Sequence, residues 1–224
     1  MPILYWIGFS DTYMPLLTII LYFLLWKYTN YHEFVILLYS IFCFILFGIT
    51  NILVLKKINN LAFYHVFSLV ELIILSHYVL KLILHKPFSL LWFFICSFYL
   101  LFWVCNIIFF EPLNSFNTTS AGITNLVVLF LCMYYLLSLS KNEAILYFQK
   151  LPSFWIVSAF LIYSALSLLV FISYAYFVNS NKQEEGSQLW AIIISMATIV
   201  KFALISVGLL CYKRNLSSPR IPLL

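Results

Sequence analysis

Charged residues are scarce in this sequence: Asp, Glu, Lys and Arg make up 8% of its 224 residues, against about a quarter in soluble domains. Hydrophobic residues account for 65% of the chain, and the mean hydropathy is +1.06. A soluble chain of this size has no packing arrangement that hides so much apolar surface from water. The shortage of charge therefore excludes an ordinary soluble domain and predicts an integral membrane protein covered by lipid.

The sequence also lacks the patterns that mark nucleic-acid binding, metal binding and catalysis. Its lysines and arginines stand singly or in pairs between apolar runs, which is a topology signal and not a basic patch. No HExxH, GxSxG, GxGxxG or P-loop pattern occurs, so we expect neither an enzyme nor a nucleic-acid partner. The five cysteines show no CxxC spacing and lie in or beside apolar segments, where thiols act as small hydrophobes. We expect no metal site.

Long apolar runs dominate the chain. A bilayer core needs roughly 20 apolar residues in a helix, and seven segments meet or approach that length. The runs are continuously apolar and do not alternate with period two, which favours helices over a barrel. We therefore predict an all-α transmembrane bundle in a single domain, 1–224, with helices at residues 13–27, 34–55, 61–81, 88–110, 121–140, 152–178 and 189–212. The first of these is the shortest.

The distribution of basic residues predicts the orientation of this bundle, because cytoplasmic loops carry an excess of Lys and Arg. One side carries eight of them: Lys27, Lys81, Lys86, Lys141, Lys150, Lys213, Arg214 and Arg220. The other side carries three: Lys56, Lys57 and Lys182. We predict that the N-terminus lies outside and the C-terminus inside. If the 13–27 segment does not cross, six spans remain and the N-terminus lies inside.

Two charged residues lie within the apolar runs. Glu71 is ten residues from each end of the 61–81 segment, and Lys201 is near the middle of the 189–212 segment. An ionisable side chain at the bilayer centre costs about 2.5–3.5 kcal/mol or more, so such groups usually face the bundle interior and pair with one another. We predict that Glu71 and Lys201 lie at similar depth and face each other. A purely structural ion pair is the alternative interpretation.

Other polar side chains share the helix faces of these two residues. Tyr64, Ser68 and Glu71 follow one another at spacings of four and three, and His65 flanks that face. Thr198 precedes Lys201 by three residues. A polar interior with aromatic walls is typical of a ligand cavity, although such residues also serve as interhelical hydrogen-bond partners. The candidate ligand-binding residues are Glu71, Lys201, Tyr64, His65, Ser68, Thr198, Trp155 and Tyr163.

A lysine in the seventh span and an acid in the third span are also the arrangement of retinal proteins, in which the lysine forms a Schiff base. Here the likeness is architectural only. The third span, "VFSLVELIIL", lacks the Arg and acid pattern of microbial rhodopsins, and the residue four positions before Lys201 is Ala197 and not an acid. We expect no cofactor, and retinal at Lys201 is kept as an alternative.

Three segments resemble those of a family of small uncharacterised seven-helix membrane proteins from Bacteroidota. They are "INNLAFYHVFSLVELIILSHY" (58–78), "LPSFWIVSAFLIYSA" (151–165) and "WAIIISMATIVKFALISVGLL" (190–210). The residues that match the family pattern are Asn59, Asn60, His65, Glu71, Phe154, Trp155 and Tyr163. Lys201 matches no family residue. The resemblance implies a membrane partner of a signalling system in the inner (cytoplasmic) membrane of a bacterial cell, and it carries no established activity over to this chain.

These observations lead to one hypothesis and two alternatives. We hypothesise a receptor-like or sensory membrane protein that binds a small apolar or lipid-like ligand near Glu71 and Lys201. The tail "YKRNLSSPRIPLL" is too short to carry an output domain, so we expect a separate cytoplasmic signalling partner. The alternatives are a structural or assembly subunit of a membrane complex, and proton or solute transport. Tight packing beside Glu71 would favour assembly, whereas a continuous wet path through Glu71 would favour transport.

Overall fold

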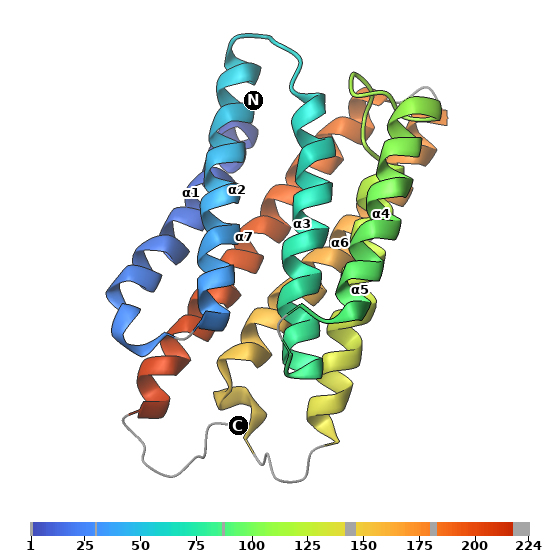
Figure 1. Cartoon of the computed structure of the whole chain (residues 1–224). Coiled ribbons are helices and arrows are strands. Elements are labelled where there is room, and N and C mark those ends of the chain that lie inside the picture. Colours follow the sequence, from blue (N-terminus) through green and yellow to red (C-terminus); the bar gives the residue numbers. More distant parts are fainter. Residues whose placement is uncertain (1, 30, 87, 142–146, 180–182, 217–224) are drawn as a thin grey trace.

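The computed structural model describes residues 2–29, 31–86, 88–141, 147–179 and 183–216, and the chain is all-α within those ranges (Figure 1). The all-α class predicted from the sequence is thereby confirmed. The helices are α1 (Pro2–Leu24), α2 (Tyr31–Leu55), α3 (Leu61–Leu84), α4 (Leu90–Phe109), α5 (Thr119–Ser140), α6 (Pro152–Asn179) and α7 (Gln183–Leu216), with two short 3₁₀ turns at Trp26–Tyr28 and Phe148–Lys150.

Six of these helices, α2 to α7, are long and apolar enough to cross a membrane. Their apolar parts are Glu33–Leu55, Leu61–Leu84, Leu90–Phe109, Thr119–Ser140, Pro152–Tyr174 and Gln188–Tyr212. In α1 the described apolar stretch, Thr12–Leu24, is shorter. Six such helices mark the chain as a multi-pass membrane protein. Whether α1 also crosses, and on which sides the termini lie, stay predictions.

Local sequence accounts for several helix ends. Ser89 has extended backbone before α4, and its side chain accepts a 3.2 Å hydrogen bond from the backbone N–H of Trp92, as an N-cap does. Pro152 opens α6, at a position where its missing N–H leaves no intrahelical hydrogen bond unmade. His85 ends α3 in the left-handed conformation, with φ of 53°, and its N–H donates to the carbonyl of Lys81.

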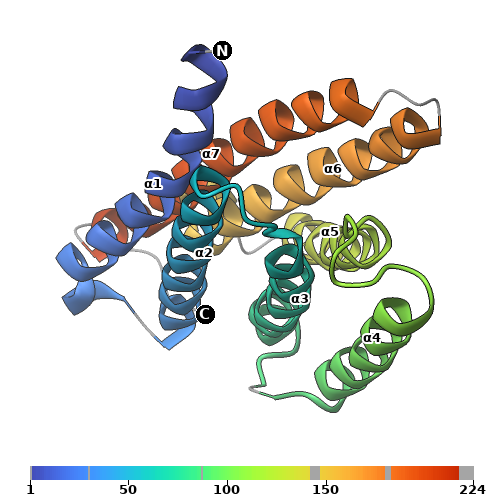
Figure 2. The ribbon, with the colours of Figure 1, turned by 90° about the horizontal axis from the view of Figure 1, so that it is seen from above.

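The helices are arranged around a shared centre. α7 packs along both α6 and α1, α5 packs along α6 and α3, and α2 packs along α1 and α3. α4 lies at the edge beside α3 and α5 (Figure 2), with only Tyr99 and Asn106 buried. Among the described residues, α3 and α7 share no extended interface. Any contact between Glu71 and Lys201 must therefore be made by long side chains and not by close backbones.

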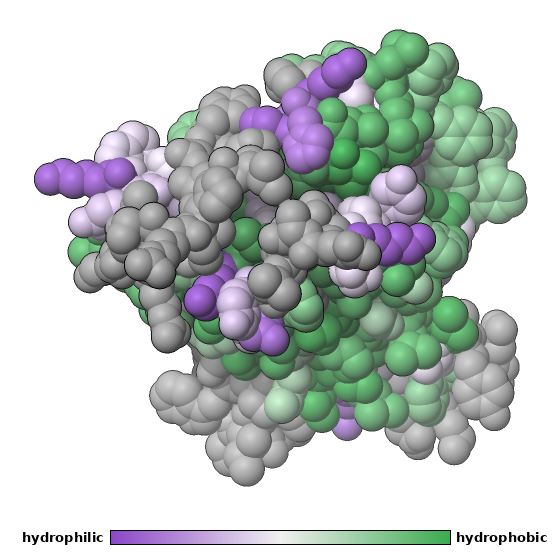
Figure 3. Space-filling view, turned by 90° about the horizontal axis from the view of Figure 1, so that it is seen from below, coloured by the Kyte–Doolittle hydropathy of each residue, from purple (hydrophilic) through white to green (hydrophobic). Residues whose placement is uncertain are grey.

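The core lies where α2, α3, α5, α6 and α7 meet. Tyr39 of α2 is fully buried there, edge-on to Phe160 of α6 and stacked with Phe202 of α7. Close approach of α6 and α7 depends on a glycine, because a Cβ at Gly208 would lie 2.8 Å from Cγ1 of Ile156. Seen from the end where the α1–α2 and α3–α4 connections lie, hydrophilic residues gather on the end face and hydrophobic residues cover much of the rim (Figure 3).

Candidate functional site

Three buried side chains from three helices form a hydrogen-bonded group at the centre of the bundle. Tyr39 of α2 donates a 2.6 Å hydrogen bond to Oε1 of Glu71 on α3. Nζ of Lys201 on α7 donates a 2.8 Å hydrogen bond to the Tyr39 hydroxyl and lies 3.5 Å from the same Glu71 oxygen. The predicted pairing of Glu71 and Lys201 is thus present in the structure. Because all three are buried away from water, these contacts supply the partners that the bilayer cannot.

Aromatic rings complete the surroundings of the Lys201 ammonium. Nζ lies 3.4 Å from the ring centroid of Tyr163 on α6, and the rings of Phe202 and Phe67 lie within 6 Å. A cation over an aromatic face gains about 2 kcal/mol or more when both are desolvated. Tyr163, one of the candidate residues, therefore contacts Lys201 and also lines the cavity described below. The ring explains how a fully buried lysine is tolerated here.

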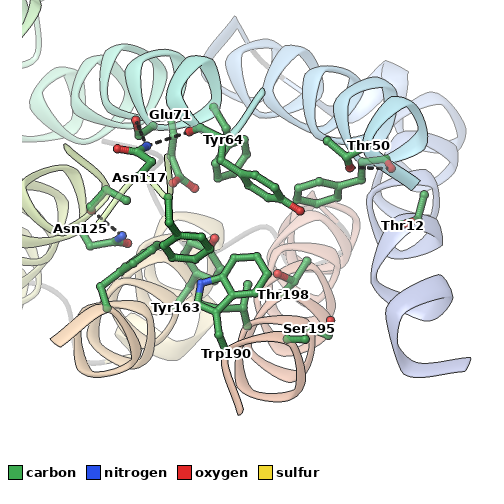
Figure 4. A pocket seen from close by; sticks show the side chains of 18 of the residues that line it. Thr12, Thr50, Tyr64, Glu71, Asn117, Asn125, Tyr163, Trp190, Ser195 and Thr198 are labelled. Carbon is green, nitrogen blue, oxygen red and sulfur yellow. Dashed lines mark hydrogen bonds between the residues drawn. The ribbon is translucent and has the colours of Figure 1, made fainter. Parts of the chain in front are cut away.

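A cavity of about 190 Å³ lies beside this group, on the side of the α2–α3 and α4–α5 connections (Figure 4). Glu71 is the only charged residue among those that line the cavity within the described part of the chain. Five of the predicted site residues line it: Tyr64, Ser68, Glu71, Tyr163 and Thr198. Other polar or aromatic residues that line it lie outside the predicted set of eight, among them Thr12, Thr50, Asn51, Phe116, Asn117, Asn125, Trp190 and Ser195. The cavity thus has hydrogen-bonding groups set among aromatic and other apolar side chains, with Glu71 bordering it.

Two buried polar atoms of the lining have no hydrogen-bond partner within the described chain. They are the indole Nε1 of Trp190 and the amide Oδ1 of Asn117. The amide orientation of Asn117 is fixed, because its nitrogen donates to the carbonyl of Tyr64 at 3.0 Å and to Oγ of Ser68 at 2.9 Å. Burying an unpaired polar group costs free energy. Each of these two atoms would therefore be stabilised by a hydrogen bond to a bound molecule.

The connection between α4 and α5 is held against the bundle by Glu111. This carboxylate accepts hydrogen bonds from Asn106, from Thr118, and from both the backbone N–H and the hydroxyl of Thr119. Partial burial alone would raise the pKa of Glu111, but these hydrogen bonds, led by that of Thr118, outweigh burial and lower the pKa below its usual value. The anchored connection delivers Phe116 and Asn117 to the cavity wall.

Three predicted site residues do not line the cavity. His65 is fully buried behind it, where its Nε2 lies 3.2 Å from the carbonyl oxygen of Ser115, so it supports the α4–α5 connection. Lys201 lies behind Glu71 and reaches the site through its contact with Glu71 and Tyr39. Trp155 lies near the start of α6, and its indole donates a 2.7 Å hydrogen bond to the carbonyl of Gln149. Trp155 therefore belongs to the opposite end of the bundle from the cavity.

Tyr39 is the central residue that sequence reasoning missed. It stands in the apolar stretch "VILLYSIFCF", and tyrosines in such stretches are usually interpreted as interfacial anchors. The available signal is its position inside the run, where a phenol needs a hydrogen-bond partner. Trp190 and Asn117 were also missed, because each depends on how a connection or a helix end folds back over the bundle.

Retinal attachment is a poor fit to this arrangement. Lys201 does not line the cavity, and its Nζ is occupied by the hydroxyl of Tyr39 and the carboxylate of Glu71. A Schiff base would have to displace both contacts. Within the described residues, no group of three or more His, Cys, Asp or Glu side chains is arranged to hold a metal ion.

A second polar contact joins two of the same helices at the other end of the bundle. The hydroxyl of Tyr212 on α7 donates a hydrogen bond to the carboxylate of Glu33 on α2, and Glu33 is buried. Lys81 of α3 lies within electrostatic range of Glu33. The helices α2, α3 and α7 therefore meet through an acid, a base and a tyrosine at two levels. At the level of Glu71 the acid is on α3, the base on α7 and the tyrosine on α2. At the level of Glu33 the acid is on α2, the base on α3 and the tyrosine on α7.

Comparison with family models, curated proteins and solved structures gives no match for this chain. The resemblance to the Bacteroidota family therefore stays a prediction. The geometry of the site combines a small, partly open cavity, unpaired hydrogen-bonding atoms and a buried charge pair of which Glu71 borders the cavity.

Proposed function

We propose that this protein is a receptor-like membrane protein that binds a small molecule in the cavity bordered by Glu71. A cavity of about 190 Å³ is somewhat larger than the engineered cavity of about 150 Å³ that binds benzene. The ligand group that enters the bundle is therefore small. The excess of basic residues on the opposite side supports an outward-facing cavity in the bacterial inner membrane.

One observation carries this proposal: Glu71 borders the cavity and also holds two other helices. Its Oε1 is bound by Tyr39 of α2 and lies 3.5 Å from Lys201 of α7. A ligand that contacts the Glu71 carboxylate competes with or strengthens those two contacts. Binding then shifts the relative stability of two arrangements of α2 and α7, which is the physical content of a receptor response.

The response reaches the cytoplasmic side through α2 and α7, according to this proposal. These two helices are joined again by Tyr212 and Glu33 near their other ends. A change in the angle between α2 and α7 at the level of Glu71 therefore also changes the geometry of the hydrogen bond between Tyr212 and Glu33. A separate cytoplasmic signalling protein is the proposed partner, and it would read the surface formed by the connections at that end.

An assembly role and a transport role are supported less well. An assembly subunit needs a tightly packed interior, but a cavity lies beside Glu71. Transport needs a path that continues beyond Glu71, yet the helices there are packed with buried side chains. Among these are Leu75, Tyr78, Phe160 and Ile205.

The test uses two Phe substitutions on α7. Ala191→Phe fills the cavity, because Ala191 lines it, whereas Met196→Phe changes an exposed position that does not. A library of small polar molecules is screened for thermal stabilisation of the purified protein in nanodiscs. We expect hits that lose their effect in Ala191→Phe, keep it in Met196→Phe, and change hydrogen exchange in the inner half of α7. Hits that act equally on both variants would contradict the proposal.

A further inference from the structure

A second hollow of about 200 Å³ lies between α6 and α7, near the ends that meet at the α6–α7 connection. Its lining is almost entirely apolar and includes Leu166, Leu169, Val170, Phe177, Leu189 and Ile193. Leu169 is 63% exposed and Leu189 is 44% exposed, so the hollow opens sideways. Both residues belong to helices that are long and apolar enough to cross the membrane. In a bilayer, this opening faces lipid acyl chains.

Trp190 lies between this apolar groove and the polar cavity, since it lines both. The indole ring packs edge-on against Phe116 at 5.3 Å and against Tyr64 at 5.5 Å between ring centroids. Phe116 in turn stacks on Tyr174, which lines the groove. The two spaces are thus neighbours divided by a thin aromatic wall. One molecule with a polar end and an apolar tail fits both spaces when that wall moves.

The atoms around the polar cavity define the chemistry of the polar end. Glu71 and Lys201 together carry no net charge, wherever the proton between them resides. An ammonium head would add a second cation beside a single carboxylate, and an anionic head would meet that carboxylate directly. A hydroxyl suits the site better, because it both donates and accepts a hydrogen bond. It can accept from the unpaired indole N–H of Trp190 and donate to the Glu71 carboxylate, which borders the cavity.

We propose that the ligand is a single-chain amphiphile with an uncharged hydroxyl head, which reaches the cavity from the bilayer between α6 and α7. The hydroxyl lies in the polar cavity and the alkyl chain lies in the groove, past Trp190. This inference rests on the proposed function. It specifies that the ligand partitions into the bilayer and enters the protein from there, and not from water. It also assigns Trp190 as the residue that divides head from tail.

The probe is dodecan-1-ol with a photoactivatable diazirine near the end of its chain, used with the full-length protein in nanodiscs. Two matched variants test the groove: Ser173→Trp places a large ring at a groove-lining position, and Ile172→Trp places it at the adjacent exposed position. We expect photolabelling of the α6 and α7 segments around the groove, lost by at least about fivefold in Ser173→Trp. Labelling in Ile172→Trp should be unchanged.

Unlabelled competitors, compared at equal mole fraction in the lipid, test the head and the tail. Dodecan-1-ol should compete at least about tenfold better than dodecylamine and than butan-1-ol. Equal competition by the amine overturns the hydroxyl assignment. If Ala191→Phe abolishes labelling but Ser173→Trp and chain length have no effect, the route through the groove is wrong and the proposed function stands. If neither Ala191→Phe nor Ser173→Trp changes the labelling, the proposed function fails as well.

Discussion

The hydroxyl of Tyr39 lies between Lys201 and Glu71, accepting a 2.8 Å hydrogen bond from one and donating a 2.6 Å hydrogen bond to the other. A single oxygen atom on α2 thereby bridges α7 and α3, which share no extended interface of their own among the described residues. The three side chains act as a unit, so their contributions to stability should be strongly non-additive.

The first prediction concerns the charge pair. Glu71→Gln should lower the free energy of unfolding by about 3–5 kcal/mol, because it leaves the buried Lys201 ammonium without a counter-charge. Lys201→Met should cost a similar amount for the converse reason. The double variant should cost clearly less than the sum of the two. Unfolding in mixed micelles measures all three, and additive costs would show that the two groups do not interact.

The second prediction isolates the bridging oxygen. Tyr39→Phe keeps the ring packing against Phe160 but removes the hydroxyl, so Glu71 and Lys201 each lose a buried partner. We expect a loss of about 1–3 kcal/mol in the free energy of unfolding. Tyr134→Phe is the matched control, because Tyr134 is exposed, and it should change stability by less than about 0.5 kcal/mol. Similar losses in the free energy of unfolding of both variants would contradict a stabilising role for the Tyr39 hydroxyl.

The third prediction concerns the contact of α6 and α7. Gly208→Ala places a Cβ 2.8 Å from Cγ1 of Ile156 and 3.0 Å from the carbonyl oxygen of Pro152, so it should destabilise the protein by about 1–3 kcal/mol. Gly48→Ala is the control, because nothing lies within 4 Å of its Cβ, and replacing a helical glycine there should stabilise by about 0.5–1 kcal/mol. Melting temperatures that shift in the same direction for both variants would contradict the close packing of α6 and α7.

The charge pair could be predicted from the sequence because its two members interrupt apolar runs, and few other charged residues do so. The all-α class followed from the same runs. The Tyr39 bridge was not predicted, since a tyrosine is compatible with a membrane interface, a packed core or a polar site. Its role became visible only when three separate helices were brought together in space.

The residues that line the cavity were harder to predict from the sequence than Glu71, which borders it. α7 begins at Gln183, before the predicted start at 189, so Trp190 lies about two turns into the helix and not at its first turn, where a tryptophan is expected to anchor the helix at the membrane surface. Asn117 lies in a connection, whose path depends on the Glu111 hydrogen bonds and not on any periodic pattern. Trp155 was assigned to the site by sequence, although the predicted span and α6 both begin at residue 152 and place it in the first turn, at the opposite end of the bundle from the cavity.

The fourth prediction is a pH dependence centred on Glu111. Its pKa is lower in the folded protein than the value of about 4.3 for an unfolded glutamate. The stabilisation it provides is therefore fully present above that unfolded value and is lost as the pH falls through the folded pKa. The melting temperature of the wild type should exceed that of Glu111→Gln at pH 7, and the difference should shrink as the pH is lowered towards 3. A difference that is constant with pH would contradict this role.

The most direct test of the central claim asks whether small molecules reach the space beside Glu71. Thr198 lines the cavity and the neighbouring Ala197 does not, although both are buried within α7. Each is replaced with cysteine in a background without the five native cysteines, and a small methanethiosulfonate reagent is added to the outer side of the membrane. The account predicts rapid modification of Thr198→Cys and little of Ala197→Cys. Equal rates, or protection of both thiols, would contradict a ligand cavity at this site.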